Sequence, residues 1–333
     1  MRAAIYGAGS LGTILGAFIT RKGGEIDLVN RNVAHVKALR ENGARVCGTM
    51  EFTQKVNAII PDAMTGKYDI IFLMTKQQHN AEVVAFLKDF LADDGVIVTL
   101  QNGIPELQIG EIVGPERVLG CTVAWGATML EPGVCELTSE PDSLTFSLGS
   151  LEKVPNRRLP EVKALLEMMG PVEVDSNFIG TRWSKLLINA AFSGMSAVLG
   201  CTFGEAAGDR RSHKYVQLLI KECIDVCATA GIRIEPVQGK DIVKLLDYYG
   251  PVKKQIAFLI IPIAIRKHAK LNSSMLQHIE KGKKTEVDAI NGVVCAFGRK
   301  VGCPTPVNDK VVEIIHRIEN GELQASFNNL KLF

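Results

Sequence analysis

The chain has 333 residues, of which 47% are hydrophobic and 22% are charged, and its formal net charge at pH 7 is +2. This length exceeds the roughly 250–300 residues at which a single hydrophobic core stops growing, so two domains are expected. The net charge is near neutral and the sequence contains no long block of charges of one sign, which argues against nucleic acid or an anionic membrane surface as a partner.

The cysteines indicate a reducing compartment, and the hydropathy pattern contains no membrane span. The eight cysteines are scattered without a C-x-x-C pair, mostly in apolar runs, so reduced and buried thiols are expected. Cys223 and Cys227 lie one helical turn apart, but no histidine or carboxylate cluster accompanies them, and no metal site is expected. The N-terminus enters a strand-like run directly, and the apolar run 257–265 has about half the length of a membrane span. We therefore expect a cytoplasmic protein.

Strand-like and helical segments alternate through the N-terminal half, which is typical of a parallel sheet covered by helices on both faces. The expected strands are 2–6, 25–30, 69–74, 95–100, 117–125 and 171–174, and the expected helices are 10–22, 33–41, a segment ending near 91, and 159–169. Between residues 128 and 149, a Pro-Gly turn and an alternating segment predict antiparallel strands appended to this sheet.

From about residue 178 the strand pattern disappears. Helical patterns with short connections follow at 183–199, 213–230, 239–248, 252–270, 285–301 and 307–319, which predicts a helical bundle. The expected architecture is therefore α/β: an N-terminal Rossmann-type dinucleotide-binding domain over residues 1–177, followed by an all-α helical domain over residues 178–333 that carries the catalytic and substrate-binding groups.

A G-x-G-x-x-G pattern follows the first strand and opens the first helix; it consists of Gly7, Ala8, Gly9, Ser10, Leu11 and Gly12. Gly7 permits a tight turn, Gly9 lets a pyrophosphate approach the backbone, and Gly12 lets the helix pack closely on the strand. The pyrophosphate would lie on free amides at the positive end of the helix dipole. The pattern predicts a dinucleotide site, with a glycine-rich turn that binds nothing as the alternative.

The residues after three strands favour NADP(H) as the nucleotide. An NAD site usually has Asp or Glu at the end of the second strand, whereas here Arg31 follows it and Asp27 lies too early. The planar guanidinium of Arg31 suits a 2′-phosphate, although an ordinary exposed arginine is the alternative. Lys76 and Asn102 follow the next two strands and would face the nucleotide, unless they are a loop lysine and an Asn-Gly turn.

The segment 183–200 is apolar except for a polar stripe. Lys185, Asn189 and Ser193 recur every four residues and so share one helix face. Buried without partners these groups would be costly, which indicates that they line a polar cleft. Partial burial would also suit Lys185 to donate a proton to a carbonyl oxygen. The alternative is that Lys185 reaches solvent at the helix start and Asn189 caps a backbone group.

Two further polar segments are compatible with plain helix capping. Ser273 or Ser274 would cap a short helix. Thr285 with Asp288 matches the [ST]-x-x-[DE] capping pattern, which leaves Glu286 in the first helical turn, where a carboxylate is favoured.

Taken together, these motifs resemble those of the ketopantoate reductase (2-dehydropantoate 2-reductase) family over nearly the whole chain. The resemblance rests on GAGSLG at 7–12, TK at 75–76, QNG at 101–103, WSKLLINAAFSG at 183–194 and SSMLQHIEKGKKTEVDAINGVV at 273–294. It implies NADPH-dependent reduction of ketopantoate to pantoate, on the route to pantothenate, with a small-molecule 2-oxo acid as substrate and no nucleic acid or membrane partner.

The resemblance also implies roles for individual residues. Lys185 would be the catalytic proton donor to the ketone oxygen, and Glu286 a second catalytic residue that supports the active site near the cofactor. Asn102, Asn189 and Ser274 would contact the substrate. The implied NADP-binding set comprises the glycine loop, Arg31, Lys76, Asn102, Gly126 and Glu286.

Ser193 departs from the family pattern, which commonly has a second asparagine two turns past the lysine. Serine still donates and accepts at the substrate site, but it reaches less far and leaves more room. Because one polar contact can change discrimination strongly, another 2-oxo acid or an imine remains an alternative substrate. A non-catalytic NADP(H) sensor is less favoured, since a sensor does not need a buried lysine. The apolar run 258–265 fits either the bundle or a homodimer contact.

Overall fold

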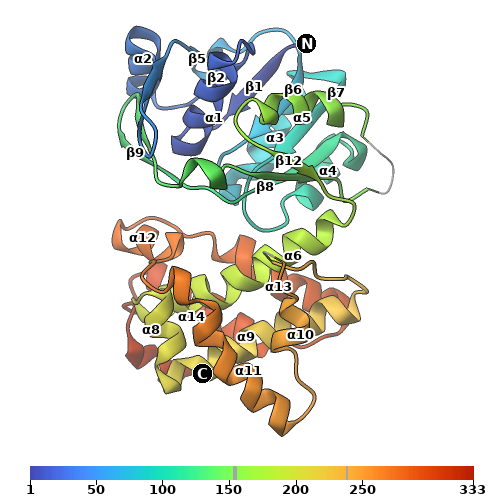
Figure 1. Ribbon diagram of the computed structural model, residues 1–333, viewed down its shortest axis with the longest axis vertical. Helices are drawn as coiled ribbons and strands as arrows, with labels where there is room; N and C mark the ends of the chain where they lie inside the picture. Colours follow the sequence, from blue (N-terminus) through green and yellow to red (C-terminus); the bar gives the residue numbers. More distant parts are fainter. Residues whose placement is uncertain (153–155, 238) are drawn as a thin grey trace. The chain divides into compact units, whose positions relative to one another are not determined.

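The computed structural model describes residues 1–152, 156–237 and 239–333. The chain divides into two compact units, one formed by residues 1–101 and 105–178 and the other by residues 102–104 and 179–333. The first unit is α/β and the second is built from helices (Figure 1). Within the described residues, no helix is both long and apolar enough to span a bilayer.

The first unit contains an eight-stranded sheet in the order β12-β11-β8-β7-β6-β1-β2-β5. All neighbouring strands are parallel except β11 and β8. Strand order runs outward from β1 in both directions, so it reverses between β1 and β6, where open α/β sheets bind ligands. The strands are β1 (Ala3–Tyr6), β2 (Asp27–Val29), β5 (Asn57–Ile59), β6 (Tyr68–Leu73), β7 (Leu91–Thr99), β8 (Val118–Val123), β11 (Phe146–Gly149) and β12 (Val172–Val174).

Both faces of this sheet are covered by helices, which explains the nearly continuous apolar strands. Ile70 and Phe72 pack on one face with side chains of α1 and α5, whereas Ile71 and Leu73 pack on the other with side chains of α3 and α4. The helices are α1 (Ser10–Arg21), α2 (Val33–Asn42), α3 (Asn80–Lys88), α4 (Glu106–Val113) and α5 (Leu159–Glu167).

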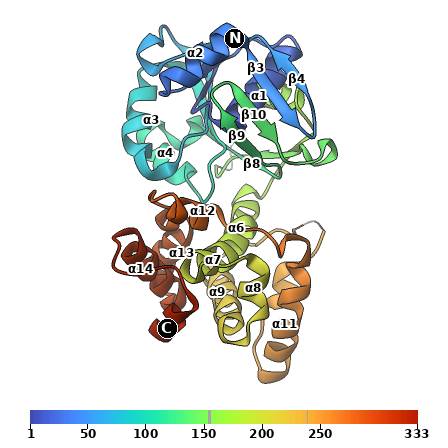
Figure 2. The same cartoon turned by 90° about the vertical axis from the view of Figure 1, so that its left-hand side faces the viewer.

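A second, four-stranded sheet lies against α1 in the order β4-β3-β10-β9 (Figure 2). Its strands are β3 (Ala44–Gly48), β4 (Phe52–Gln54), β9 (Ala127–Glu131) and β10 (Val134–Leu137). The expectation that the strands between 128 and 149 extend the main sheet is therefore wrong for β9 and β10, and only β11 joins it. The reason is that β10 pairs with β3, which places the buried side chains of Cys135 and Leu137 in the core beneath α1.

The second unit is a bundle around α9 (Arg210–Thr229), which packs on α13 (Val287–Val301) and α14 (Pro306–Glu319). One expectation is wrong here, because the helix at 183–199 is not continuous. Residues Asn189–Ser193 form a π-helical turn between α6 and α7. The other helices are α6 (Phe178–Ile188), α7 (Gly194–Leu199), α8 (Phe203–Gly208), α10 (Ile242–Leu246), α11 (Pro251–Ala264) and α12 (Ser274–Glu280).

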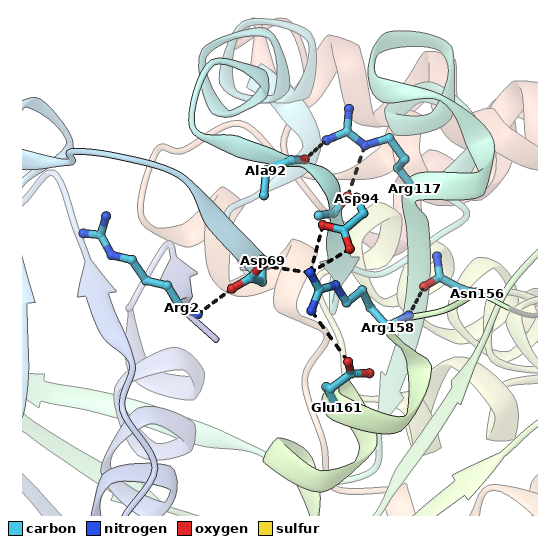
Figure 3. A network of polar contacts seen from close by, with 9 residues as sticks. Arg2, Asp69, Ala92, Asp94, Arg117, Asn156, Arg158 and Glu161 are labelled. Atoms are coloured by element: carbon cyan, nitrogen blue, oxygen red, sulfur yellow. Dashed lines mark hydrogen bonds and ion pairs between the residues drawn. The ribbon is translucent and has the colours of Figure 1, made fainter.

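An arginine at the start of α5 ties that helix to the amino ends of two strands (Figure 3). A guanidinium nitrogen of Arg158 lies 2.9 Å from Asp69 Oδ1 and 2.8 Å from Asp94 Oδ1, and the other terminal nitrogen lies 3.6 Å from Glu161 Oε1. The backbone amide of Arg2 donates to the second oxygen of Asp69 at 2.7 Å. Hydrogen bonding from Arg158 holds the pKa of the Asp94 carboxyl below its usual value.

We expect Arg158→Met to lower the melting temperature by a few degrees at pH 7, because methionine keeps the apolar stem but removes the cation. Since the pKa of Asp94 is lower in the folded than in the unfolded chain, its contribution is present above the unfolded value of about 3.9 and disappears as pH falls through the folded value. The melting temperatures of wild type and Arg158→Met, measured from pH 7 to about pH 2.5, should therefore come closer together as the pH falls.

Lys163→Met is the matched control for this test. It removes an exposed ion pair with Glu167 on the same helix, and it should change the melting temperature by less than Arg158→Met. A difference between wild type and Arg158→Met that widens toward acidic pH would contradict the assignment.

Candidate active site

The glycine loop is shaped by two close approaches. Gly7 has φ +94°, and a Cβ there would lie 2.6 Å from Thr75 N, so both the backbone conformation and the space require glycine. At Gly12 a Cβ would lie 2.9 Å from Ile5 Cγ2, which shows how closely α1 packs on β1. At Gly9 the nearest atom to a Cβ would be Gly7 O at 3.9 Å. Gly9 therefore borders open space, which a ligand phosphate can approach.

The carbonyl of Ala8 is held from two sides. Asn30, directly after β2, donates to Ala8 O at 2.7 Å, and Thr13 Oγ1 on α1 donates to it at 3.1 Å. The buried ring of His35 supports Thr13, with Nε2 at 3.0 Å from its hydroxyl, while Nδ1 accepts from Gly133 N at 3.0 Å. Because Nδ1 accepts, Nε2 carries the proton, and burial lowers the pKa of this histidine. A neutral histidine thus helps to fix the loop.

Arg31 lies exposed at the mouth of a pocket of about 380 Å³ at the carboxyl ends of β1, β2 and β5. The pocket is lined by Tyr6, Arg31, Val33, Ile60, Pro61, Asp62 and Phe86. It combines an aromatic wall with a guanidinium, which suits a nucleotide base and a phosphate. The carboxyl of Asp62 gives the same pocket one negative group.

Asp27 makes its hydrogen bonds away from this pocket, so it is not placed to bond the ribose of a nucleotide bound there. Its Oδ2 accepts from Tyr68 OH at 2.7 Å and from a guanidinium nitrogen of Arg2 at 3.2 Å, and its Oδ1 accepts from Asn57 Nδ2 at 2.6 Å. All these contacts lie at the amino ends of parallel strands, opposite the glycine loop. This agrees with the sequence argument that Asp27 lies too early for a ribose contact.

Two loops that follow β6 and β7 are joined by a buried amide pair. Gln101 Nε2 donates to Thr75 O and to Asn80 Oδ1, each at 2.7 Å, and Gln101 Oε1 accepts from Asn80 Nδ2 at 3.1 Å. This pair fixes the loop that carries Lys76, which is exposed, relative to Gln101 just after β7. Asn102, the next residue after Gln101, is half-buried. Gly103 has φ +76°, as its Asn-Gly turn predicts.

Gly126 follows β8 in a tight connection to β9. Its amide donates to Ser139 Oγ at 2.9 Å, and its carbonyl accepts from Thr138 N at 3.1 Å. A cofactor contact at Gly126 therefore remains a prediction, and an incoming acceptor would have to replace Ser139.

In the helical unit, the π turn changes how the polar stripe is presented. Lys185 lies half-buried near the end of α6, Asn189 begins the π turn half-buried, and Ser193 ends it with 6% exposure. In a regular α-helix each step of four residues drifts by about 40° around the axis. The i→i+5 bonds of a π turn rotate the chain less per residue and oppose that drift. The turn thus keeps these positions closer to one face.

Ser274 belongs to α12, which is attached to α7. Ser273 caps α12 by accepting from Leu276 N at 2.9 Å, and Ser273 N donates to Ser196 Oγ on α7 at 3.3 Å. Of the two serines proposed as caps, Ser273 is therefore the cap. Ser274 is the first residue of α12 and is exposed.

Glu286 is the N-cap residue of α13, and the expected Thr285–Asp288 capping box is wrong. Thr285 Oγ1 accepts from Val287 N at 3.2 Å, but the Thr285 amide, which a capping box would pair with Asp288, donates instead to Glu319 Oε1 at 2.6 Å. The carboxylate of Asp288 pairs with His316 on α14, at 3.0 Å between Oδ1 and Nε2. Glu286 is half-buried at the positive end of the helix dipole.

The expected residues fall in both units. Those expected to bind the nucleotide lie at the carboxyl ends of the sheet strands, except Asn102 and Glu286, which belong to the helical unit. Those expected to bind the substrate or to transfer the proton lie on α6, on the π turn and at the starts of α12 and α13, together with Asn102. Sequence reasoning missed the polar residues that hold these segments in place, which are Asn30, His35, Asn80, Gln101 and Asn291; the last of these donates to Ala190 O in the π turn. A polar side chain directly after a strand, as in Asn30 and Gln101, is the signal that could have identified two of them.

Two family models match the chain. The model described as ketopantoate reductase PanE/ApbA matches residues 3–150, and the model described as ketopantoate reductase PanE/ApbA C terminal matches residues 177–319. The 2-dehydropantoate 2-reductase of Pyrococcus horikoshii is 29% identical over 312 residues, which cover 92% of this chain and 94% of that protein. That of Streptococcus pyogenes is 24% identical over 318 residues, which cover 95% and 97%.

Solved structures share the fold. A PanE/ApbA family ketopantoate reductase from Ralstonia eutropha superposes with a TM-score of 0.81 at 24% identity, covering 97% of this chain and 99% of the other. D-mandelate dehydrogenase with NADH and anilino(oxo)acetate superposes with a TM-score of 0.80 at 22% identity, covering 96% and 99%. Because the family models together span both units, the chain belongs to the ketopantoate reductase family of NADP-dependent oxidoreductases.

Proposed function

We propose that this protein reduces 2-dehydropantoate (ketopantoate) to pantoate with NADPH, in pantothenate biosynthesis. The observation that carries the proposal is the family match over both units, which includes the segment with Lys185 and the segment with Ser274 and Glu286. The curated relatives that bear this name are matched over more than nine tenths of both chains. The eight free cysteines support a reducing, cytoplasmic location.

The N-terminal unit offers the groups that NADPH requires. The open side of Gly9 and the amides at the start of α1 would take the pyrophosphate, with Ser10 and Leu11 in the first turn. Arg31 would hold the 2′-phosphate at its pocket, and Lys76 would add positive charge nearby. When bound, NADPH supplies the hydride for the ketone carbon.

In the helical unit, each polar residue would have its own task. Lys185 would donate the proton to the ketone oxygen and would stabilise the negative charge that develops there. Asn189, Ser193 and Ser274 would bind the 2-oxo acid, with Ser274 at its carboxylate, and Asn102 would contact both substrate and nicotinamide. Glu286 would support the site near the cofactor.

Because of Ser193, a substrate other than ketopantoate is an alternative. A hydroxyl in place of the family's usual amide leaves a wider pocket with one polar group fewer. The mandelate dehydrogenase, whose ligand anilino(oxo)acetate is a different oxo acid, shares this fold. Reduction of another 2-oxo acid or an imine is therefore the alternative, and a non-catalytic NADP(H) sensor is the least favoured reading.

We expect Lys185→Ala to lower kcat for ketopantoate by about 10²- to 10⁴-fold, because it removes the general acid. The dissociation constant for NADPH, measured by titration calorimetry, should stay within about twofold, because the pyrophosphate and the 2′-phosphate are assigned to the other unit. Lys300→Ala, at an exposed position of the same unit, is the control and should match wild type. Equal losses of turnover and NADPH binding would remove Lys185 as the proton donor.

Substitutions in the glycine loop separate folding from nucleotide binding. Gly9→Ala should keep the melting temperature, because its Cβ meets only Gly7 O at 3.9 Å, but should weaken NADPH binding at least about tenfold by occupying the phosphate's space. Gly7→Ala should instead lower the melting temperature, because its Cβ would collide with Thr75.

Gly208→Ala, which meets open space in the helical unit, is the control for both properties. Calorimetric titration and thermal unfolding without nucleotide give the two readouts. The phosphate assignment fails if Gly9→Ala binds NADPH as tightly as wild type.

We also propose a homodimer through one face of α11. Val252, Ile256, Leu259 and Ile263 recur every three or four residues and are 74%, 50%, 61% and 71% exposed, and Tyr249 beside them is 81% exposed. Together they expose on the order of 400 Å² of apolar surface. This approaches the apolar share of the roughly 800 Å² that each partner buries in a stable interface, and a two-fold axis would pair the face with itself.

Light scattering after size exclusion tests the homodimer. Wild type should have the mass of a dimer, and Leu259→Asp should have that of a monomer. Leu130→Asp, at a 57% exposed leucine in the other unit, should remain dimeric. A monomeric wild type at tens of micromolar would reject the interface.

A further inference from the structure

The π turn breaks the regular hydrogen-bond pairing of the helix around Ala190. In an α-helix the carbonyl of Ala190 would accept from the amide of Gly194, four residues further on. That amide instead donates to the carbonyls of Asn189 and Ala191. The turn that contains Asn189 and Ser193 therefore replaces the regular α-helical donor of the Ala190 carbonyl.

A buried asparagine on another helix bonds to this carbonyl. Asn291, on α13 and 0% exposed, donates from Nδ2 to Ala190 O at 3.1 Å and to Asn308 Oδ1 at 2.9 Å. Both amide hydrogens are thus used. Its Oδ1 is buried and has no hydrogen-bond partner among the described residues. The unmet buried oxygen is itself unfavourable, so the two donated bonds are what an apolar residue of similar size, such as leucine, would not supply at this position.

The orientation of this amide is set by a buried carboxylate. Glu222 on α9 is 9% exposed and accepts from Val307 N at 2.8 Å, Asn308 N at 2.9 Å and Asn308 Nδ2 at 2.8 Å. It thereby caps the positive end of α14. Because Asn308 Nδ2 is engaged with Glu222, Asn308 Oδ1 is turned toward Asn291 and fixes which end of the Asn291 amide faces the turn.

The end of the π turn is packed directly on the same asparagine. A Cβ at Gly194 would lie 3.0 Å from Asn291 Oδ1, 3.1 Å from Asn291 Nδ2 and 3.1 Å from Val311 Cγ1. Glycine at this position is what allows α13 to approach so closely. The turn and Asn291 are therefore fitted to each other both by a hydrogen bond and by contact.

We propose that the buried Glu222–Asn308–Asn291 chain positions the substrate-binding segment. Asn291 fixes the geometry of the π turn by holding the Ala190 carbonyl, and so sets the directions in which the two polar side chains of the turn project. Asn291 acts through the turn and is a positioning residue.

The inference rests on the proposed function in one respect, the assignment of Asn189 and Ser193 to the substrate. Lys185 lies in α6, before the turn, so its position does not depend on the Asn291 contact. Loss of that contact should therefore weaken substrate binding and leave proton transfer largely intact. The expected signature is a raised KM for the 2-oxo acid with kcat nearly unchanged.

Asn291→Leu tests the proposal, with Asn329→Leu as the matched control. Asn329 is also buried, at 5% exposure, and donates to the α7 carbonyl of Val198 and to Gln324 O, each at 2.9 Å, and neither acceptor belongs to the π turn. Asn291→Leu should raise KM about tenfold with kcat within about twofold of wild type. It should also speed hydrogen–deuterium exchange in residues 189–195. Asn329→Leu should do neither.

The proposal is overturned if both variants raise KM equally, or if Asn291→Leu changes neither KM nor exchange. Should Asn291→Leu not fold, Gly194→Ala gives a second route, since its Cβ displaces the Asn291 amide and should reproduce the faster exchange and the KM effect. A wild-type protein inactive on every 2-oxo acid would reject the proposed function, whereas the exchange comparison decides separately whether Asn291 fixes the turn.

Discussion

The contact between two backbone turns, one after β1 and one after β6, sets the geometry of the nucleotide side of this protein. Gly7 lies so close to Thr75 N that a Cβ would come within 2.6 Å of it. The contact occurs where strand order reverses in the sheet, so it defines the edge at which a ligand is held. Hydrogen bonds from Asn30 to Ala8 O and from Gln101 to Thr75 O hold the two turns in this close contact.

In the helical unit, a polar segment is also held in a defined geometry, but by side chains from other helices. A short π turn gives a polar stripe a direction that a regular helix would not, and the Ala190 carbonyl loses its α-helical donor there and accepts from Asn291. Buried side chains from three other helices supply that support through Glu222, Asn308 and Asn291. In each unit, buried amide side chains hold one segment that carries residues assigned to a ligand: the loop after β6 and the π turn.

The parts that sequence predicted were those determined locally. A buried strand, a glycine pattern and a helix start lie within twenty residues of each other, so the first strand–turn–helix unit was predictable. The β3–β10 pairing was not, because it joins short segments about 90 residues apart, as in the contact of Cys47 Sγ with Cys135 O. The Thr285–Asp288 capping pattern failed because two residues of a later helix take its groups: Glu319 accepts from the Thr285 amide, and His316 pairs with the Asp288 carboxylate. The π turn has no local signature, and its support by Asn291 depends on tertiary packing.

The most direct test is the steady-state kinetics of the purified protein with ketopantoate, followed at the nicotinamide absorbance with NADPH and separately with NADH, against a panel of other 2-oxo acids. We expect kcat/KM to be highest for ketopantoate and NADPH to be strongly preferred over NADH. Tight NADPH binding together with a higher kcat/KM for a different 2-oxo acid would contradict the substrate assignment and would direct attention to the pocket around Ser193.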